Sequence, residues 1–536
     1  MINNISNLQT LLFSFLLTCS FTNSILVITP WTGGHFSFPL NIATALANSG
    51  HNVTFLAFLH DPNIPVSDNI KYVVLDNVSS EMRSFEYLNE VAVTSGALDG
   101  PSEKMIFRSI VGNPVMIGET LKQLKLRLDY VFREEMNSLI QKSNFDLMIV
   151  EETIYHPVAI LARRFDIPLV TAIPVVDHQR ARNEQNLPVL LTSEASQFLN
   201  IRGSTPPTFV ERVELFLELG NFVLKLVLEI VDMMSGYLAA DGLDSITDLD
   251  NVTQLYLVND HPALSFPHLQ APNSISMAGI EFTQDVKLLD GDVLQFINKA
   301  NEIGKRIVLV SLGTLAFTLD HYNSMFGEEF LRNLATLDNV AVIVRSDREY
   351  PDLPDVLARP WLPQQALLAS SSVNFIISSC GNSAKIEAVL HNVPLLCIPL
   401  FTDQYFNSLL VKQNNFGEML VKEEFSHDRL KEILVRLLEN GTDYRNKMVA
   451  ASHAVLKFPG SPADRLVFYC NQLMEFGNLG YLRNGVIVQQ SFVHVHNLDV
   501  FGVLFAALLI GTITILVLCK KAVNIGLEKI KTEKLD

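Results

Sequence analysis

Short apolar runs alternate with longer mixed segments along most of the chain, and the alternation begins near the N-terminus. Residues 24–30 (SILVITP) predict a buried strand, a Gly-Gly-His turn ends at His35, and residues 38–49 predict a helix that stops at Gly50. The apolar run NVTFLAF follows directly. A strand, a helix and a second strand at this spacing form a βαβ unit, so we expect a parallel sheet.

The same alternation continues for two more strands and then changes. FDLMIVE (145–151) predicts a strand, a helix follows to Phe165, and PLVTAIP predicts the next strand. Residues from about 179 to 250 predict a helical insertion, in which TFVERVELFLELGNFVLKLVLEIVDMM is apolar but interrupted by charges. Those charges argue against a transmembrane span. The segment therefore predicts a helix that packs in the core or shapes an acceptor pocket, and the alternative is an interfacial membrane helix.

A second α/β unit follows a boundary expected between residues 282 and 301. KRIVLVSLGT (305–314) and VAVIVRS predict strands. The stretch 361–407 predicts a strand, a glycine-containing turn, a helix, another strand and a polar loop, and helices up to about residue 476 complete the unit. Substrates bind beyond the carboxyl ends of parallel strands, so a chain with two such sheets is expected to work in the cleft between them.

The two ends of the chain carry apolar segments of different kinds. Residues 1–23 predict a signal peptide with an apolar centre at 8–17, although they lack Lys and Arg; the alternative is a buried first helix. Residues 500–519 have no charged side chain, and about 20 residues span roughly 30 Å, the thickness of the bilayer core. The alternative is a buried core helix. Two lysines follow, so the tail 520–536 is expected in the cytoplasm and the body in the lumen or outside the cell.

Composition narrows the class of protein. The 536 residues are 48% hydrophobic and carry a formal net charge of −17, which argues against a nucleic-acid partner because phosphate binding needs a basic surface. Three cysteines lie between the end segments without metal-ligand spacing, so at most one disulfide is expected and free thiols fit equally well. Sequons for N-glycosylation agree with the prediction that the body of the protein lies in the lumen. The cysteines are Cys380, Cys397 and Cys470, and the sequons begin at Asn52, Asn77, Asn251 and Asn440.

A candidate base stands at the end of the first strand. An imidazole at His35 could remove a proton from a bound hydroxyl at neutral pH, and the alternative is a structural histidine in the turn. A carboxylate would orient the ring and stabilise its protonated form. Glu151 and Glu152 end the strand 145–151 at the equivalent edge of the same sheet, and strand alternation allows only one of them to face His35.

The second unit carries residues suited to a nucleotide sugar. An indole can stack on a base, amides and carboxylates can bind ribose and sugar hydroxyls, and two strand-to-helix turns can face phosphates. The indole is as readily explained as part of the core. The candidates are Trp361 and Gln364 for base and ribose, Glu387 for ribose, Ser379, Gly381, Ser383, Ser311 and Thr314 for phosphate, and Asp403 and Gln404 for the sugar.

These residues stand in a register that resembles the membrane-bound UDP-glycosyltransferases of the animal endoplasmic reticulum. The family signature is approximately W-x-P-Q, H-G-G-x-N-S-x-x-E-A, G-V-P and P-x-x-x-D-Q-x-x-N, and the resemblance extends over nearly the whole chain. The matching positions are Trp361, Pro363, Gln364, Gly381, Glu387, Ala388, Val393, Pro394, Pro399, Asp403, Gln404 and Asn407.

The departures from the signature fall on its phosphate contacts. The signature histidine falls on Ser379, its first glycine on Cys380 and its asparagine on Ser383. A serine cannot offer a positive charge, and a charge-assisted hydrogen bond is roughly twice as strong as a neutral one, so weaker donor binding or leaving-group stabilisation is expected. The place of the family's aspartate partner falls on Glu151, and Asn392 replaces a glycine at the end of a helix.

The resemblance implies an α/β fold of two Rossmann-like domains facing a cleft (the GT-B arrangement) plus one C-terminal transmembrane helix. It divides the chain into a signal peptide (1–23), an acceptor-binding domain (24–290), a UDP-sugar-binding domain (291–490), a membrane span (500–519) and a cytoplasmic tail (520–536). It places the protein in the endoplasmic reticulum membrane as a single-pass type I protein with a luminal body, and leaves open its assembly into homo- or hetero-oligomers with related transferases.

The implied reaction is inverting transfer of glucose or glucuronic acid from a UDP-sugar to a hydroxyl of a small lipophilic acceptor. His35 would be the base and Glu151 its partner, with no metal and no cofactor besides the UDP-sugar co-substrate. The alternative is a catalytically weak or inactive relative that acts as a binding partner. An NAD-dependent enzyme is disfavoured because no G-x-G-x-x-G follows either first strand.

Overall fold

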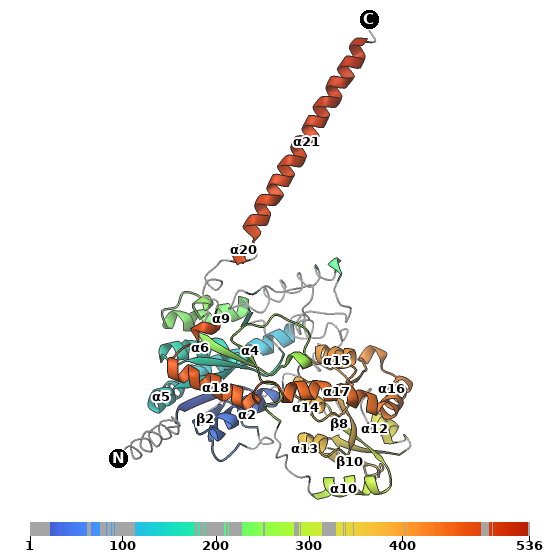
Figure 1. Ribbon diagram of the computed structural model, residues 1–536. Helices are drawn as coiled ribbons and strands as arrows, with labels where there is room; N and C mark the ends of the chain where they lie inside the picture. The colour runs from blue at the N-terminus through green and yellow to red at the C-terminus, as the bar shows by residue number, and fades with distance from the viewer. Residues whose placement is uncertain are drawn as a thin grey trace, which may run out of the picture.

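The fold consists of two α/β lobes that lie side by side, with one long helix projecting from them (Figure 1). The computed structural model describes residues 22–61, 66–74, 113–176, 228–249, 252–282, 291–313, 328–335, 339–346, 348–400, 403–483, 492–495 and 497–533, with a few single positions between them. Both sheets in these ranges are parallel. This confirms the predicted α/β class.

The first lobe is built on a seven-stranded sheet with the order β3-β2-β1-β4-β5-β6-β7. Its strands are β1 (Ser24–Thr29), β2 (Asn52–Ala57), β3 (Lys71–Val74), β4 (Leu147–Glu151), β5 (Leu169–Ile173), β6 (Thr253–Val258) and β7 (Ser274–Ser276). Its helices include α2 (Gly34–Asn48), α4 (Pro114–Val131), α5 (Glu134–Ser143), α6 (Tyr155–Arg164) and α9 (Leu228–Ala240). The predicted strands of this lobe are confirmed.

The second lobe is built on a six-stranded sheet with the order β10-β9-β8-β11-β12-β13. Its strands are β8 (Arg306–Ser311), β9 (Val340–Arg345), β10 (Val356–Arg359), β11 (Val373–Ser378), β12 (Leu395–Cys397) and β13 (Gly417–Met419). Its helices are α10 (Gly291–Glu302), α12 (Glu328–Ala335), α13 (Gln364–Ala369), α14 (Asn382–Leu390), α15 (Gln404–Gln413), α16 (His427–Glu439) and α17 (Gly441–Leu456). Helix α13 lies where the sequence indicated only a strand.

Helices cover both faces of each sheet, which is why the strands are apolar along their whole length. In β1, Ile25 and Val27 pack into a core on one face of the first sheet, whereas Leu26 and Ile28 pack into a separate core on the other face. All four side chains are fully buried. Alternate residues of a strand point to opposite faces, so one apolar run serves two cores.

Helix α18 (Pro462–Phe476) returns from the second lobe to the first. Figure 1 shows it beside α2, and its Leu466, Cys470 and Leu473 lie in the core that also contains Val27 of β1. The sequence prediction included this helix in the second unit. Its apolar face is instead buried against the first sheet, so the end of the globular chain packs on both lobes.

One helix in the described ranges is long and apolar enough to cross a membrane, over Leu498–Asn524. It is part of α21 (Leu498–Glu533), which follows the short α20 (Phe492–Val495) and points away from both lobes (Figure 1). Its apolar side chains are exposed, so it is not the buried core helix that was the alternative. The predicted signal peptide lies almost wholly outside the described residues.

Candidate active site at the junction of the two sheets

Helix α2 begins four residues earlier than the sequence predicted, and this places His35 in its first turn. Gly33 caps the helix with φ of 67°, and its carbonyl accepts the N–H groups of Phe36 and Ser37. Glycine adopts this left-handed conformation at little cost, so the chain can turn sharply out of β1. The turn aims His35 across the carboxyl end of the sheet.

The proline in this helix explains why its start is difficult to predict. Pro39 has no N–H, so it cannot donate to the carbonyl of His35 four residues earlier. Thr29 Oγ1, at the end of β1, donates to that carbonyl at 2.6 Å. The strand thus supplies the hydrogen bond that the helix lacks, and it holds the backbone of His35 in place.

His35 and Glu151 form a direct pair. Nδ1 of His35 lies 2.7 Å from Oε1 of Glu151, whose side chain is fully buried while that of His35 is 19% exposed. Strands β1 and β4 are neighbours in register, so their carboxyl ends bring the two residues together. A carboxylate can only accept, so Nδ1 carries the hydrogen and Nε2 is the nitrogen that can take up a proton. Glu151, and not Glu152, is the carboxylate that pairs with His35.

Three residues that the sequence reasoning did not single out surround this pair. Thr153 donates its hydroxyl and its backbone N–H to Oε2 of Glu151, and Trp31 Nε1 donates to Thr153 Oγ1 at 2.7 Å. The guanidinium carbon of Arg127 lies 3.4 Å from the centroid of a Trp31 ring. Trp31 could have been noticed in the turn before His35, but Arg127 lies on α4 and has no local signal.

In the second lobe, Ser379 and Gly381 lie in the turn between β11 and α14. Gly381 is the N-cap of α14, and the first N–H groups of this helix have no partner within it. Ser379 is 2% exposed, and its hydroxyl donates to the carbonyl of Leu312 at 2.9 Å. Since a hydroxyl carries one hydrogen, Ser379 has none left for a phosphate in this conformation, and the helix N-terminus is the better anion site.

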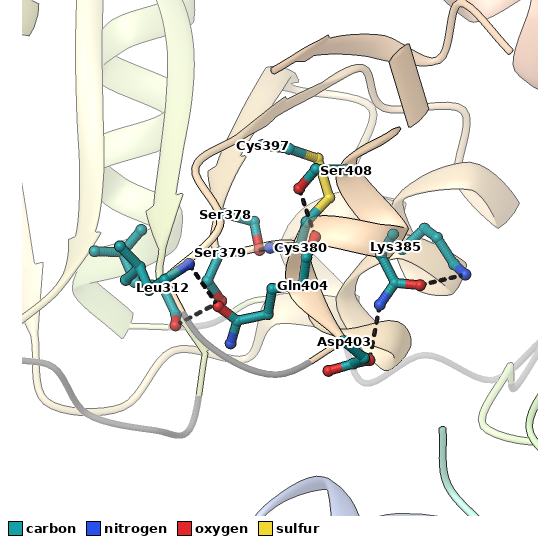
Figure 2. Close-up of a disulfide and its surroundings, with 11 residues drawn as sticks. Leu312, Ser378, Ser379, Cys380, Lys385, Cys397, Asp403, Gln404 and Ser408 are labelled. Carbon is teal, nitrogen blue, oxygen red and sulfur yellow. Dashed lines mark hydrogen bonds between the residues drawn. A yellow bond between two sulfur atoms is a disulfide. The ribbon is translucent and has the colours of Figure 1, made fainter. Parts of the chain in front are cut away.

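The same turn is closed by a disulfide between Cys380 and Cys397, whose Cα atoms are 5.2 Å apart (Figure 2). Cys380 has φ of 66°, in the left-handed region where the family signature has glycine. Cys397 ends β12, the neighbour of β11. The bridge therefore ties the turn to the adjacent strand, and of the alternatives that the sequence left open the structure has one disulfide with Cys470 free.

The candidate ribose residues lie on α13 and α14, and the candidate base residue Trp361 lies three residues before α13. Trp361 is 39% exposed, and the guanidinium carbon of Arg345 lies 4.9 Å from its ring centroid. Gln364 Nε2 donates to Glu387 Oε2 at 2.7 Å. Burial raises the pKa of Glu387 to about 7, and the hydrogen bond from Gln364 opposes this shift.

The candidate sugar residues lie at the start of α15, where Asp403 is the N-cap and Gln404 the first helical residue. Asn407 Nδ2 donates to Asp403 Oδ2 at 2.8 Å, and the fully buried Lys385 donates to Asn407 Oδ1 at 2.9 Å. Figure 2 shows Lys385 and Asp403 near the disulfide turn. Gln404 Oε1 accepts from the backbone of Leu400 at 2.9 Å, which fixes the amide.

Two of the remaining candidates, Ser311 and Ser383, lie at the same edge of the second sheet. Ser311 ends β8 and is 5% exposed, and it pairs in register with Ser378 at the end of β11. Ser383 lies half-buried in the first turn of α14. Thr314 lies outside the described residues.

The carboxyl edges of the two sheets meet at α14. Asn382 Nδ2 donates to the carbonyls of Pro174 at 3.0 Å and Asn259 at 2.7 Å, and Pro174 and Asn259 directly follow β5 and β6. Asn382 is the first residue of α14, the helix that follows β11. The ends of strands from both lobes therefore face one another across this helix N-terminus, with the His35–Glu151 pair on one side and Trp361, Glu387 and Asp403 on the other.

Two parallel sheets that meet at their carboxyl edges, with a C-terminal helix crossing back, form the GT-B arrangement of glycosyltransferases. Solved glycosyltransferases show the same fold. The structure of the glycosyltransferase VinC in complex with dTDP superposes with a TM-score of 0.56 at 18% identity, and covers 85% of this chain and 100% of its own. A Phytolacca americana UGT2 complexed with UDP-2-fluoro-glucose and pterostilbene gives 0.51 at 14% identity, with coverages of 84% and 99%.

The chain belongs to the UDP-glucoronosyl and UDP-glucosyl transferase family, whose model matches residues 24–533. It is similar to UDP-glucuronosyltransferase 3A1 of Bos taurus, with 27% identity over 96% of each chain. It is also similar to human UDP-glucuronosyltransferase 3A2, with 25% identity over 91% of each. A shorter match, over 49% of this chain and 48% of the relative, is to human 2-hydroxyacylsphingosine 1-beta-galactosyltransferase at 28% identity.

Proposed function

We propose that this protein transfers a hexose, glucose or glucuronic acid, from a UDP-sugar to a hydroxyl of a small lipophilic acceptor, with inversion at the anomeric carbon. The observation that carries the proposal is the 2.7 Å contact between His35 and Glu151 at the junction of the two sheets. A histidine oriented by a buried carboxylate and partly open to solvent is suited to act as a general base.

His35 Nε2 would take the proton of the acceptor hydroxyl. The oxygen would then attack the anomeric carbon as the bond from that carbon to the UDP oxygen breaks, and the electron pair of that bond would leave with UDP. Negative charge develops on the departing diphosphate, and the N-terminus of α14 offers it free N–H groups and the positive end of a helix dipole. Ser311, Gly381, Ser383 and Thr314 would line the phosphates.

The donor would be held from base to sugar along the edge of the second sheet. Trp361 would stack on the uracil, Glu387 and Gln364 would bind the ribose hydroxyls, and Asp403 and Gln404 would bind the hydroxyls of the hexose. Gln364, Asp403 and Gln404 lie at the start of helices that follow strands, as residues of nucleotide sites in such sheets do, and Glu387 lies further along α14.

The acceptor would lie in the first lobe, beside His35. We propose a lipophilic acceptor because the insertion between β5 and β6 is rich in apolar residues. We propose that the candidate membrane helix anchors the protein. The two lysines after it would lie in the cytoplasm and the body in the lumen of the endoplasmic reticulum, as the family resemblance implies, with self-association or association with related transferases.

Release of UDP from UDP-glucose or UDP-glucuronic acid tests the proposal. Membranes that contain the full-length protein are given 4-nitrophenol and 1-naphthol as acceptors, and the wild type is compared with His35→Ala. The expected rate of the variant is lower by about 10²- to 10⁴-fold, the usual contribution of a general base. His453→Ala, an exposed histidine on α17, is the matched control and should match the wild type.

A weak or inactive relative is the second candidate, and it is favoured by the hydrogen bond from Ser379 to Leu312. Ser379 offers neither a positive charge nor a free hydroxyl hydrogen to the donor. In that case the wild type would bind UDP, as measured by calorimetry, but would release no more of it from UDP-sugars than His35→Ala does.

A further inference from the structure

The pair of His35 and Glu151 is the end of a longer line of hydrogen bonds. Trp31, in the turn after β1, donates to Thr153 Oγ1 at 2.7 Å, Thr153 donates to Glu151 Oε2, and Glu151 Oε1 accepts from His35 Nδ1 at 2.7 Å. The residues come from segments separated by more than one hundred positions in the sequence. Trp31 is 3% exposed and Glu151 is fully buried, whereas Thr153 between them is exposed.

Which group donates and which accepts in each of these hydrogen bonds follows from the side-chain types. An indole N–H can only donate, so the oxygen of Thr153 must accept from Trp31. The single hydroxyl hydrogen of Thr153 then points to Glu151, because a carboxylate can only accept. Both oxygens of Glu151 are therefore engaged, Oε2 by the hydroxyl and backbone N–H of Thr153 and Oε1 by His35. The bond from Trp31 polarises the hydroxyl that donates to Glu151, so these two bonds strengthen one another, and His35 donates to the other oxygen of the same carboxylate.

Arg127 contacts the Trp31 end of this network. It is fully buried on α4, its Nη1 donates to the backbone carbonyl of Gln123 at 3.0 Å, and its guanidinium carbon lies 3.4 Å from a Trp31 ring centroid. Burial lowers the pKa of Arg127 to about 9, and the negative charge of Glu151 opposes this shift. A cation stacked on the indole both fixes the plane of the ring and balances the buried carboxylate.

We propose that Thr153 and Trp31 are positioning residues for the base: they hold the Glu151 carboxylate so that its other oxygen keeps His35 in the reactive tautomer and orientation, with Arg127 holding Trp31. The inference rests on His35 being the base of the proposed function. Glu151 has one more rotatable bond than the aspartate that the family has at this place, so an unrestrained side chain would visit positions that do not meet His35.

The test compares variants of the full-length protein in membranes, with UDP-glucose, UDP-glucuronic acid and the two phenols. Thr153→Val should lower kcat by about tenfold or more and leave the KM for the UDP-sugar within about twofold, because geometry at the base and not donor binding changes. Thr153→Ser keeps a hydroxyl and should retain most activity. Thr153 is exposed, so its replacement should not unfold the protein.

Two further variants separate positioning from general damage. Trp31→Phe keeps an aromatic ring against Arg127 but removes the N–H. The indole acts through the hydroxyl of Thr153, so the double variant Trp31→Phe with Thr153→Val should have the same kcat as Thr153→Val alone. Thr44→Val is the matched control. Thr44 lies on α2, the helix of His35, and its hydroxyl donates to Leu40 at 2.8 Å without touching Glu151. It should match the wild type.

A proton NMR measurement tests the same positioning role, and it does not depend on how well these phenols serve as acceptors. The His35 Nδ1–H donated to a carboxylate should give a downfield proton resonance in detergent-solubilised protein, assigned by its absence in His35→Gln. It should persist in Thr44→Val and weaken or vanish in Thr153→Val. An unchanged resonance and a kcat equal to that of Thr44→Val would overturn the inference while leaving His35 as the base. Wild-type turnover in His35→Ala would overturn both proposals.

Discussion

Two glutamates at the junction of the sheets differ because their neighbours differ. Glu151 accepts from His35 and Thr153, and it lies opposite a buried arginine. Burial raises the pKa of Glu387 to about 7. Burial also raises the pKa of nearby Glu281 to about 7, and the negative charge of Glu387 adds to that shift. Glu387 therefore titrates near neutral pH.

The affinity for UDP should therefore rise with pH. The carboxylate form of Glu387 accepts hydrogen bonds from ribose hydroxyls, and with a pKa of about 7 this form increases roughly tenfold between pH 6 and pH 8. Calorimetric titration with UDP across this range measures the slope. In Glu387→Gln only UDP and the other groups titrate, so the UDP affinity should depend less steeply on pH than in the wild type. Equal slopes in the two proteins would contradict this role for Glu387.

At the scale of an element, the start of α2 depends on a contact with a strand. Pro39 removes the N–H that would bind the His35 carbonyl, and Thr29 of β1 replaces it at 2.6 Å. Thr29 is fully buried. An unpaired buried carbonyl costs about 1–3 kcal/mol, so this one hydroxyl matters for the geometry of the whole first turn.

The compensation between Thr29 and Pro39 can be measured. Thr29→Val should lower the free energy of unfolding by about 1–3 kcal/mol because the His35 carbonyl loses its donor. Adding Pro39→Ala restores a backbone N–H at the helical position and should recover about 1 kcal/mol of that loss. Urea unfolding followed by circular dichroism compares the variants. A double variant that is less stable than Thr29→Val alone would show that the proline is not the reason for the strand contact.

At the scale of the whole molecule, α14 joins the two lobes through side chains that are buried and polar. Asn382 donates to Pro174 and Asn259, and Lys385 donates to the carbonyl of Leu264 at 3.0 Å. Burial lowers the pKa of Lys385 to about 8, against the attraction of Asp260 and Asp403. The helix that faces the donor phosphates in our proposal is therefore also the helix that holds the lobes together.

Loss of one of these contacts should loosen the junction. Asn382→Ala leaves two buried carbonyls without this donor, and each such loss costs about 1–3 kcal/mol. Amide hydrogen exchange measured by mass spectrometry should be about 5- to 100-fold faster in the peptides around residue 259, where the first lobe meets α14. Asn414→Ala removes a similar amide bond, at 3.1 Å to Leu410 within α15, and should leave those peptides unchanged. Uniform acceleration in both variants would argue against a specific junction.

The sequence predicted the strands of both lobes because each is a short apolar run bounded by turn residues, a local signal. The strand pattern also predicted that one of Glu151 and Glu152 reaches His35, and the family resemblance implied that it is Glu151. It could not predict the start of α2, which depends on Thr29, nor the return of α18 to the first lobe. Those outcomes depend on residues far away in the chain.

Periodicity, spacing and residue type are local properties, and they were enough to predict the fold class, the register of the family signature, the positive-φ helix end at Asn392 and the apolar C-terminal helix. The hydrogen-bond partners of the site residues depend instead on how the whole chain packs. Trp31 meets Thr153 across 122 positions, and Ser379 donates to Leu312 across 67. Hydrogen bonds need atoms within about 3 Å, and packing of the whole chain sets such distances.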